Sequence, residues 1–170
     1  MRLALTLYPW SDEWLSIGKF CQIAHGVQIV TSSANHRYEG LSSFPFAIFD
    51  RDENWLDRPS MPNAGADTVI GHDVWIGTSV LILPGAVIGD GVIIGAGVVV
   101  GGTTPPYYVI AGNPVQVIRA RLTSDDAARM QEIAWWNWPI EDISVHETEI
   151  CGTDLDAPER VSLEIAARHG

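Results

Sequence analysis

Aliphatic residues recur at every sixth position through the middle of the chain. The series runs Ile70, Ile76, Ile82, Ile88, Ile94 and Val100. A glycine follows five of these six residues, and a small or β-branched residue stands four places after each of them. The same register occurs earlier, at Ile17, Ile23 and Ile29. Two positions that stay in phase through consecutive units indicate a repeated structural unit.

A period of six does not fit an amphipathic helix, whose apolar face recurs at three and four residues. It fits one flat face of a triangular parallel β-helix, in which a short strand is followed by a corner. The aliphatic residue and the small residue four places later then point into the prism. The glycine beside the aliphatic residue is expected to let the chain turn at the corner. The fold class is therefore mainly β, with a parallel β-helix as its core.

The repeats are interrupted once. The first coil covers residues 17–34, and the next two coils cover 70–87 and 88–105. Between them, residues 35–69 have no six-residue pattern and are rich in Pro, Asp, Asn and Gly. A loop of this length inside a compact domain is usually functional. Its aromatic residues are expected to anchor it against a coil or a neighbouring subunit. These residues are Phe44, Phe46 and Trp55.

A helical segment is predicted after the repeats end. Thr123 and Ser124 precede two acidic residues, which is a typical helix N-terminus, and Pro139 ends the apolar helical spacing that follows. Shorter helices are expected over 141–149 and from about Pro158. Three tryptophans in this segment are expected to pack against the coil or a neighbour, rather than bind a ligand. They are Trp135, Trp136 and Trp138. The predicted organisation is a β-helix over residues 1–118, with the insertion, and a helical extension of the same domain over 119–170.

Composition narrows the class of protein. Hydrophobic residues make up 46% of the 170 residues and charged residues 18%, which excludes a disordered chain. A net charge of −11 disfavours nucleic acid and anionic membrane as partners, although a local cationic patch can still hold an anionic cofactor. The first ten residues are expected to belong to the mature fold. The two cysteines, Cys21 and Cys151, suit a reducing cytoplasm, and an inward Cys21 is a poor nucleophile. No spacing suggests a metal site.

Several local segments occur together in one order: "IGKFCQIAHGVQIVTSSANHR", "SSFPF", "VIGHDVWIG", "PPYYVIAGNPVQVIRARL" and "IAWWNWP". In this the chain resembles the xenobiotic acetyltransferase branch of the hexapeptide-repeat acyltransferases, which includes streptogramin A and type B chloramphenicol acetyltransferases. The resemblance covers about residues 14–150. It implies a left-handed β-helix, a homotrimer, acetyl-CoA as co-substrate without a metal, and a small-molecule hydroxyl acceptor, with an antibiotic as one candidate.

The transfer of acetyl to a hydroxyl needs a base, and neutral imidazole suits that role near pH 7. The resemblance assigns the role to His36, at the start of the insertion. The alternative is a surface histidine in a polar loop. No catalytic role is expected for the other histidines: His25 and His72 occupy corner positions, where exposure is the default, and His146 and His169 lie in the C-terminal segment.

The resemblance also implies that coenzyme A lies along a prism edge in a cleft between two subunits. The positions that correspond to its binding residues are Trp75, Thr78, Ala96, Gly101, Gly102 and Arg119. Arg119 is the expected phosphate partner, with Arg121 as a solvated alternative. Trp75 is placed near the reacting end, although an exposed aromatic residue on a flat face equally suits a subunit interface. Gly101-Gly102 replaces the usual Thr-Lys, and Gln116 replaces a Lys or Arg, so two cations common in the family are missing.

The sequence therefore predicts an acetyl-CoA-dependent O-acetyltransferase. Two alternatives stay open at this point. One is a sugar or serine O-acetyltransferase of the wider hexapeptide group, which differs only in its acceptor. The other is a non-catalytic β-helix protein that acts as a binding module or as a scaffold.

Overall fold

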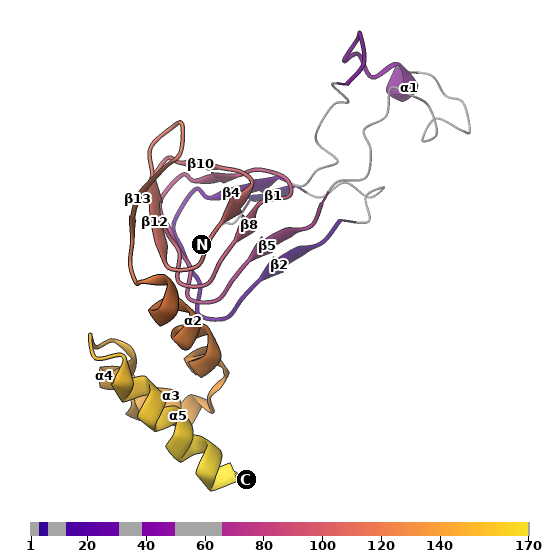
Figure 1. Ribbon diagram of the computed structural model, residues 1–170. Coiled ribbons are helices and arrows are strands. Elements are labelled where there is room, and N and C mark those ends of the chain that lie inside the picture. The colour runs from indigo at the N-terminus through magenta and orange to yellow at the C-terminus, as the bar shows by residue number, and fades with distance from the viewer. Residues whose placement is uncertain (1–3, 7–12, 31–38, 50–65, 170) are drawn as a thin grey trace.

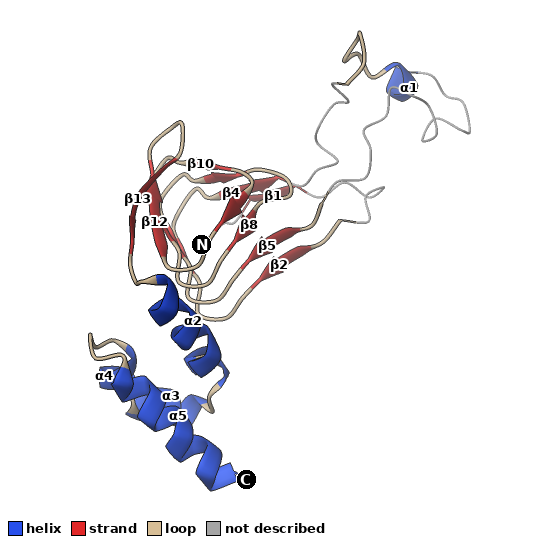
Figure 2. Cartoon of the chain, viewed as in Figure 1, coloured by secondary structure: helices blue, strands red, loops and turns tan. Residues whose placement is uncertain are grey.

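The computed structural model describes residues 4–6, 13–30, 39–49 and 66–169. In this part of the chain, short strands wind around a triangular prism, and helices extend from one end of it (Figure 1). Figure 2 shows the same division, with the strands in the prism and most helices beyond it.

The strands form three sheets, which are the faces of the prism. Sheet A contains, in order, β1 (Ala4–Thr6), β4 (Gln28–Val30), β7 (Leu81–Ile82) and β10 (Val99–Val100). Sheet B contains β11 (Thr103–Thr104), β8 (Val87–Ile88), β5 (Thr68–Ile70) and β2 (Leu15–Ile17). Sheet C contains β13 (Gln116–Ala120), β12 (Tyr108–Ala111), β9 (Ile93–Ile94), β6 (Trp75–Ile76) and β3 (Gln22–Ile23).

The order of strands along the chain makes this a β-helix. From β2 to β10 the chain visits sheets B, C and A in turn, and each strand pairs in parallel with the strand one coil away. Within the described ranges, only β12 and β13 pair antiparallel, as a hairpin that closes sheet C. The six-residue pattern therefore predicted both the parallel pairing and its register.

The interior of the prism contains the repeated residues. Each aliphatic residue of the series from Ile70 to Val100 is at most 1% exposed. The small residues four places later, such as Val74 and Ala86, are fully buried. In the first coil Cys21 is half-buried and packs against the same core. The predicted inward positions are therefore confirmed.

The glycines of the repeat have a different role from the one expected. A Cβ on Gly77 would lie 2.7 Å from the backbone nitrogen of Ala96 and 2.8 Å from the carbonyl oxygen of Ile94. The turn itself takes place two residues later, where Ser79 has a φ of 57° and Gly85, its equivalent in the next repeat, has 70°. Gly77 is thus required because the neighbouring coil comes so close, and the prediction that it serves the corner turn was wrong.

The insertion occupies one corner of the first coil. It leaves the prism after β4 in sheet A and returns at β5 in sheet B. Because β5 begins at Thr68, residues 68 and 69 belong to the coil and not to the insertion. A short helix, α1 (Phe46–Phe49), lies within the insertion. The rings of Phe44, Phe46 and Phe49 contact one another and are largely exposed, while Trp55 lies outside the described residues.

Helices follow the last strand and form what is called here the helical tail (residues 124–169). They are α2 (Ser124–Ile133), the 3₁₀ turn η3 (Trp135–Asn137), α3 (Ile140–Val145), α4 (Glu147–Ile150) and α5 (Asp156–His169). Thr123 caps α2, because its hydroxyl accepts a hydrogen bond from the Asp126 N–H. Trp135 and Trp136 are buried, and Trp138 packs against the same cluster. The three tryptophans thus pack as predicted.

Candidate functional site

The prism has three edges, and each one has a different environment. The B–C edge consists of corners 18–21, 71–74, 89–92 and 105–107. The C–A edge consists of corners 24–27, 77–80 and 95–98. The A–B edge consists of corners 83–86 and 101–102, together with the insertion in the first coil. The candidate residues are distributed over these edges.

Four of the predicted cofactor residues lie on sheet C or on the C–A edge beside it. Thr78 and Ala96 are exposed on consecutive corners of the C–A edge, where the Gly97 N–H donates to the Thr78 carbonyl oxygen at 2.8 Å. Trp75 and Arg119 lie in one row across sheet C, because Trp75 pairs with Ile93, Ile93 with Val109 and Val109 with Arg119. This row lies beside the B–C edge, because Trp75 directly follows the corner 71–74. Trp75 is 52% exposed, so its indole is open to a ligand or to another subunit.

The other two predicted cofactor residues are elsewhere. Gly101 and Gly102 form a corner of the A–B edge, on the opposite side of sheet A from Thr78 and Ala96. A Cβ on Gly102 would meet no atom within 4 Å, so the surface there is open. The insertion that carries His36 leaves and returns at this same edge. The structure therefore divides the predicted cofactor set between two edges.

The histidines can be placed only in part. His36 lies outside the described residues, and its role stays a prediction. His25 is exposed on the C–A edge, as expected. His72 differs from expectation: its ring stacks on Trp136, with centroids 5.0 Å apart, and its Nδ1 accepts the Lys19 N–H at 2.9 Å. The helical tail covers the B–C edge at this point, and this contact could not be seen in the repeat pattern.

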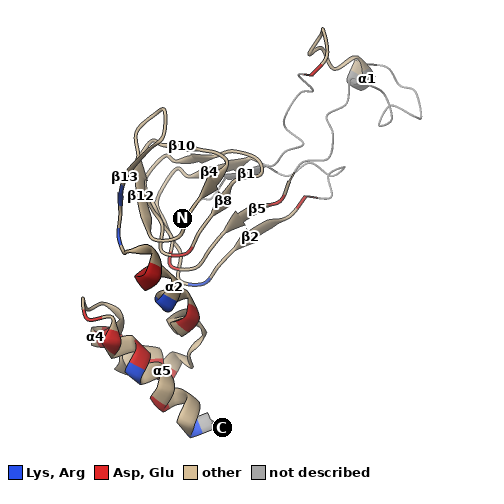
Figure 3. Cartoon of the chain, viewed as in Figure 1, with Lys and Arg blue, Asp and Glu red and all other residues tan. Residues whose placement is uncertain are grey.

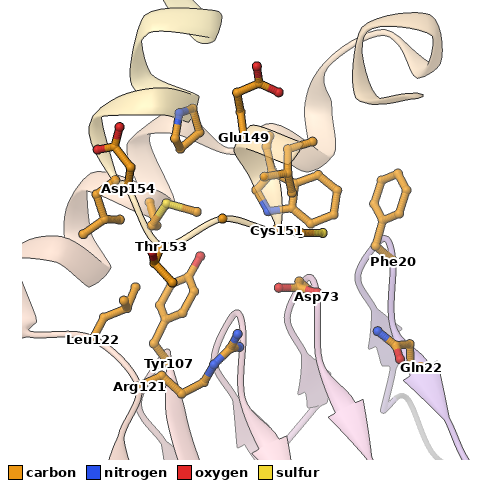
Figure 4. A pocket seen from close by; sticks show the side chains of 16 residues that line it. Phe20, Gln22, Asp73, Tyr107, Arg121, Leu122, Glu149, Cys151, Thr153 and Asp154 are labelled. Atoms are coloured by element: carbon orange, nitrogen blue, oxygen red, sulfur yellow. The ribbon is translucent and has the colours of Figure 1, made fainter. Parts of the chain in front are cut away.

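A cavity that the sequence did not reveal lies between the B–C edge and the helical tail. Its volume is ≈ 680 Å³. Phe20, Asp73 and Tyr107 line it from the prism, and Trp135 and Cys151 line it from the tail (Figure 4). The available signal was subtle. The three prism residues occupy the corner position where other repeats have glycine, and they have positive φ angles of 60°, 53° and 59°.

The charged groups around the cavity are held in fixed positions. Arg121 donates to the carbonyl oxygen of Gly91 and lies over the Tyr107 ring, 5.7 Å from its centroid, and the residue remains exposed to solvent. Burial raises the pKa of the Asp73 carboxyl, with Arg121 opposing this shift and Asp90 adding to it. Burial also raises the pKa of Tyr107, and Asp73 and Asp90 contribute further.

Cys21 behaves as a packed thiol. Its Sγ lies 3.1 Å from the carbonyl oxygen of Gly71, and burial raises its pKa. A thiol with a raised pKa is a poor nucleophile near neutral pH. In the described part of the chain, no group of three or more His, Cys, Asp and Glu is arranged to hold a metal ion. None of the described helices combines the length and hydrophobicity that a membrane span requires.

Comparison with known proteins identifies the family. The bacterial transferase hexapeptide (six repeats) family matches residues 67–102. A probable macrolide acetyltransferase of Lysinibacillus sphaericus is 41% identical over 140 residues, which is 80% of this chain and 76% of that protein. A chloramphenicol acetyltransferase of Klebsiella aerogenes is 34% identical over 163 residues, 94% of this chain and 78% of that protein. The chain belongs to the xenobiotic acetyltransferase branch of the hexapeptide-repeat acyltransferases.

Membership of the xenobiotic acetyltransferase branch makes this protein an acyltransferase and disfavours the non-catalytic scaffold. Among solved structures, the polysialic acid O-acetyltransferase OatWY matches with a TM-score of 0.51 and 26% identity. The match covers 76% of this chain and 57% of that one, so the chain spans just over half of that structure's length.

Proposed function

We propose that the protein is an O-acetyltransferase that transfers acetyl from acetyl-CoA to a hydroxyl of a small molecule, with an antibiotic as a candidate acceptor. The observation that carries this proposal is the identity of 34–41%, over most of the chain, to enzymes named macrolide and chloramphenicol acetyltransferases. In the reaction an ester forms between the acetyl carbon and the acceptor oxygen. The thioester bond breaks, and coenzyme A leaves as a thiol.

His36 is the proposed general base that takes the proton from the acceptor hydroxyl. The start of the insertion supports this role, because it follows directly on β4, where Ile29 is fully buried. The insertion leaves the prism at the A–B edge, after β4. The same edge displays Gly101 and Gly102 two coils away, which is about 10 Å at the usual spacing between strands.

Acetyl-CoA is proposed to bind in a cleft between two subunits of a homotrimer. The division of the predicted residues supports this, because a second subunit could bring its A–B edge, with Gly101 and Gly102, against the C–A edge of the first. The Arg119 guanidinium is exposed and donates only to the neighbouring Ala120 carbonyl among the described residues, so most of its donors can reach a phosphate. Exposed apolar side chains beside it, Val117 and Ile118, suit a subunit contact.

Two finer features belong to the same proposal. The left-handed sense of the coil is taken from the family. The division of the chain into a β-helix over 1–118 and a helical extension over 119–170 is likewise proposed. A cytoplasmic location follows from the cysteine content and the family. Light scattering that gives a monomer at micromolar concentration would contradict the shared cleft.

A saccharide is the second candidate acceptor. The observation that favours it is the match to the polysialic acid O-acetyltransferase OatWY, which is 26% identical to this chain. A panel that contains chloramphenicol, a macrolide, a streptogramin A and simple sugars would distinguish the two candidates. Product should be read by mass spectrometry of the acetylated acceptor, because the exposed Cys151 would react with a thiol reagent.

The decisive variant is His36→Ala. Loss of the general base should lower turnover by roughly 10² to 10⁴. His146→Ala is the control, since His146 lies in the helical tail between α3 and α4, away from both edges of the proposed cleft, and it should retain near wild-type turnover. Turnover of the wild type should also fall as the pH drops through the imidazole range, because a protonated imidazole cannot accept a proton. Near wild-type turnover in His36→Ala would place the base elsewhere.

A further inference from the structure

We propose that the cavity between the B–C edge and the helical tail is a second binding site, and that its ligand is a small protonated amine with an apolar body. This site is distinct from the edges proposed for acetyl transfer. Gly101 and Gly102 belong to the A–B edge, and Thr78 and Ala96 to the C–A edge. Trp75 and Arg119 lie on sheet C and do not line the cavity. The inference goes beyond the transferase activity and does not depend on it.

The cavity has the size and walls of a ligand site. At ≈ 680 Å³ it falls within the roughly 300–1,000 Å³ that small-molecule sites occupy. The rings of Phe20 and Trp135 form one wall, with centroids 4.8 Å apart and planes tilted by 49°. Leu122, Met130 and Leu155 add aliphatic surface. Two aromatic rings beside an apolar wall suit a ligand that combines a hydrocarbon body with a cation.

Two polar side chains of the cavity lack hydrogen-bond partners among the residues that the structure describes. Tyr107 is 3% exposed, and its phenol oxygen is buried with no hydrogen-bond partner among the residues that the structure describes. Its hydroxyl points from the prism toward the segment of the tail that carries Thr153 (Figure 4). The Asp73 carboxylate also makes no hydrogen bond or ion pair with any described residue. An unmade hydrogen bond on a buried group destabilises a protein, and such groups usually have an explanation.

A ligand of the proposed class would supply both missing partners. Its ammonium can donate to the Asp73 carboxylate, and an oxygen at its other end can accept from the Tyr107 hydroxyl. In Figure 4 these two side chains project into the cavity from corners of the B–C edge that are two coils apart, with Cys151 and Thr153 facing them from the tail.

The charges around the cavity favour a cation over an anion. The carboxylates of Asp73, Glu149 and Asp154 line it, against the guanidinium of Arg121. Asp154 already pairs with Arg160, and the Arg121 guanidinium donates to the Gly91 carbonyl and lies over the Tyr107 ring, so Asp73 is the carboxylate that a bound cation would meet. Figure 3 shows acidic positions on α2, α4 and α5 of the helical tail, with basic positions among them on α2 and α5. Burial raises the pKa of Asp73, and a bound ammonium would stabilise its ionised form.

The backbone of the prism supports the same conclusion. Phe20 and Tyr107 are held in the left-handed region, which bulky side chains rarely adopt, at a position where Gly91 and Gly97 serve other repeats. Strain of this kind is often found at ligand sites. At three corners of this edge, Phe20, Asp73 and Tyr107 thus replace the glycine that fits a positive φ without strain. These three side chains line the cavity.

The test is isothermal titration calorimetry with tyramine, and with 4-ethylphenol, which has the same ring and hydroxyl but no ammonium. No acetyl-CoA is present, so the outcome is independent of the transferase proposal. Tyramine should bind the wild-type protein, and 4-ethylphenol should bind at least tenfold more weakly. Equal affinities for the two probes, or no detectable heat with millimolar tyramine, would overturn the proposal.

Two variants locate the binding. Asp73→Asn should weaken tyramine at least tenfold, and asparagine tolerates the positive φ of 53° at this position. Tyr107→Phe should weaken it severalfold while keeping the fold, since it removes a hydroxyl that has no partner. Asp125→Asn on the exposed first turn of α2 makes the same change of charge outside the cavity and should leave the affinity unchanged. Wild-type affinity in Asp73→Asn would overturn the assignment, and circular dichroism melting confirms that each variant is folded.

Discussion

The interior of the prism and the interface between the B–C edge and the helical tail are packed in different ways. Inside the prism, residues of nearly one type and size repeat from coil to coil, and the series from Ile70 to Val100 is almost completely buried. At the interface, the buried side chains are large and of several types, including Tyr107, Trp135 and Trp136. The prism is filled, whereas the interface contains a cavity of ≈ 680 Å³ and an unpartnered hydroxyl.

The difference shows what repetition can and cannot specify. A repeated six-residue unit places the same side chain against its own copy in the next coil, so a single choice of residue fills the whole interior. The helical tail meets the prism only once, and its contacts have no such repetition. That makes the interface the region where pockets can form and where new binding chemistry can be accommodated without loss of the fold.

The largest expected effect tests the interior against the outer surface within one strand. In β8, Ile88 points into the prism and is 1% exposed, whereas Val87 beside it points outward. Ile88→Asp buries an unpaired charge and should cost more than about 4 kcal/mol of unfolding free energy, which prevents stable folding. Val87→Asp should fold. Circular dichroism melting decides, and a cooperative Ile88→Asp variant of wild-type stability would refute the inward assignment.

The next effect concerns the interface alone. Trp136 is 4% exposed and stacks on His72, so Trp136→Ala should weaken the docking of the tail by about 3–5 kcal/mol. Because the coils support one another, the prism should remain folded while the tail becomes sensitive to protease. Limited proteolysis followed by mass spectrometry measures this. Val145→Ala, at an exposed position on α3, is the control, and equal protection of the tail in both variants would contradict the proposed docking.

A smaller effect is expected at the start of the tail. The Thr123 hydroxyl accepts the Asp126 N–H at 3.2 Å and caps α2. Thr123→Ala should therefore lower stability by about 1 kcal/mol. Ser124→Ala is the matched control, since the Ser124 hydroxyl contacts only the adjacent Asp125 side chain at 3.3 Å among its described partners. Chemical denaturation should show a loss only for Thr123→Ala; equal losses would mean that the cap contributes nothing specific.

The comparison also explains what the sequence could predict. The register of the coils follows from side chains that repeat, so the inward positions were predicted correctly and the tryptophans of the tail were expected to pack. The role of Gly77 was misjudged, because the atom that leaves no room for a Cβ there is the backbone nitrogen of Ala96 in the next coil. Such a contact depends on how the coils stack and is not visible in one repeat. The exposure of His72 was misjudged for a similar reason, since its cover comes from Trp136, far away in the sequence.

The candidate site was predicted less completely than the fold. The family resemblance led to Trp75, Thr78, Ala96 and Arg119, which lie on sheet C or on the C–A edge beside it, but it could not show that Gly101 and Gly102 belong to another edge. The cavity was missed because it needs both the corner residues and the tail. His36 lies outside the described residues, and its role as a base awaits the turnover measurement.

The smallest expected effect returns to the interface and depends on pH. Burial is the main reason that the pKa of Asp73 is raised above its ordinary value of 3.8, with Arg121 opposing and Asp90 adding. The folded protein therefore holds the Asp73 proton more tightly than the unfolded chain does. The stability that this proton provides is fully present below about pH 3.8 and is lost as the pH rises through the higher folded-state pKa. At pH 7 the carboxylate is thus a cost to folding that asparagine does not have.

Asp73→Asn should accordingly raise the melting temperature slightly at pH 7, and the gain should shrink as the pH falls toward 3.8. Asp125→Asn should change stability in the opposite direction, by a few tenths of a kcal/mol, because it removes a negative charge from the first turn of α2. Melting curves of both variants across this pH range distinguish the two environments. If Asp73→Asn melts lower than the wild type at pH 7, the attraction of Arg121 outweighs burial. The charge of Asp73 would then be compensated within the interface, and the interface would differ from the interior of the prism only in how closely its side chains pack.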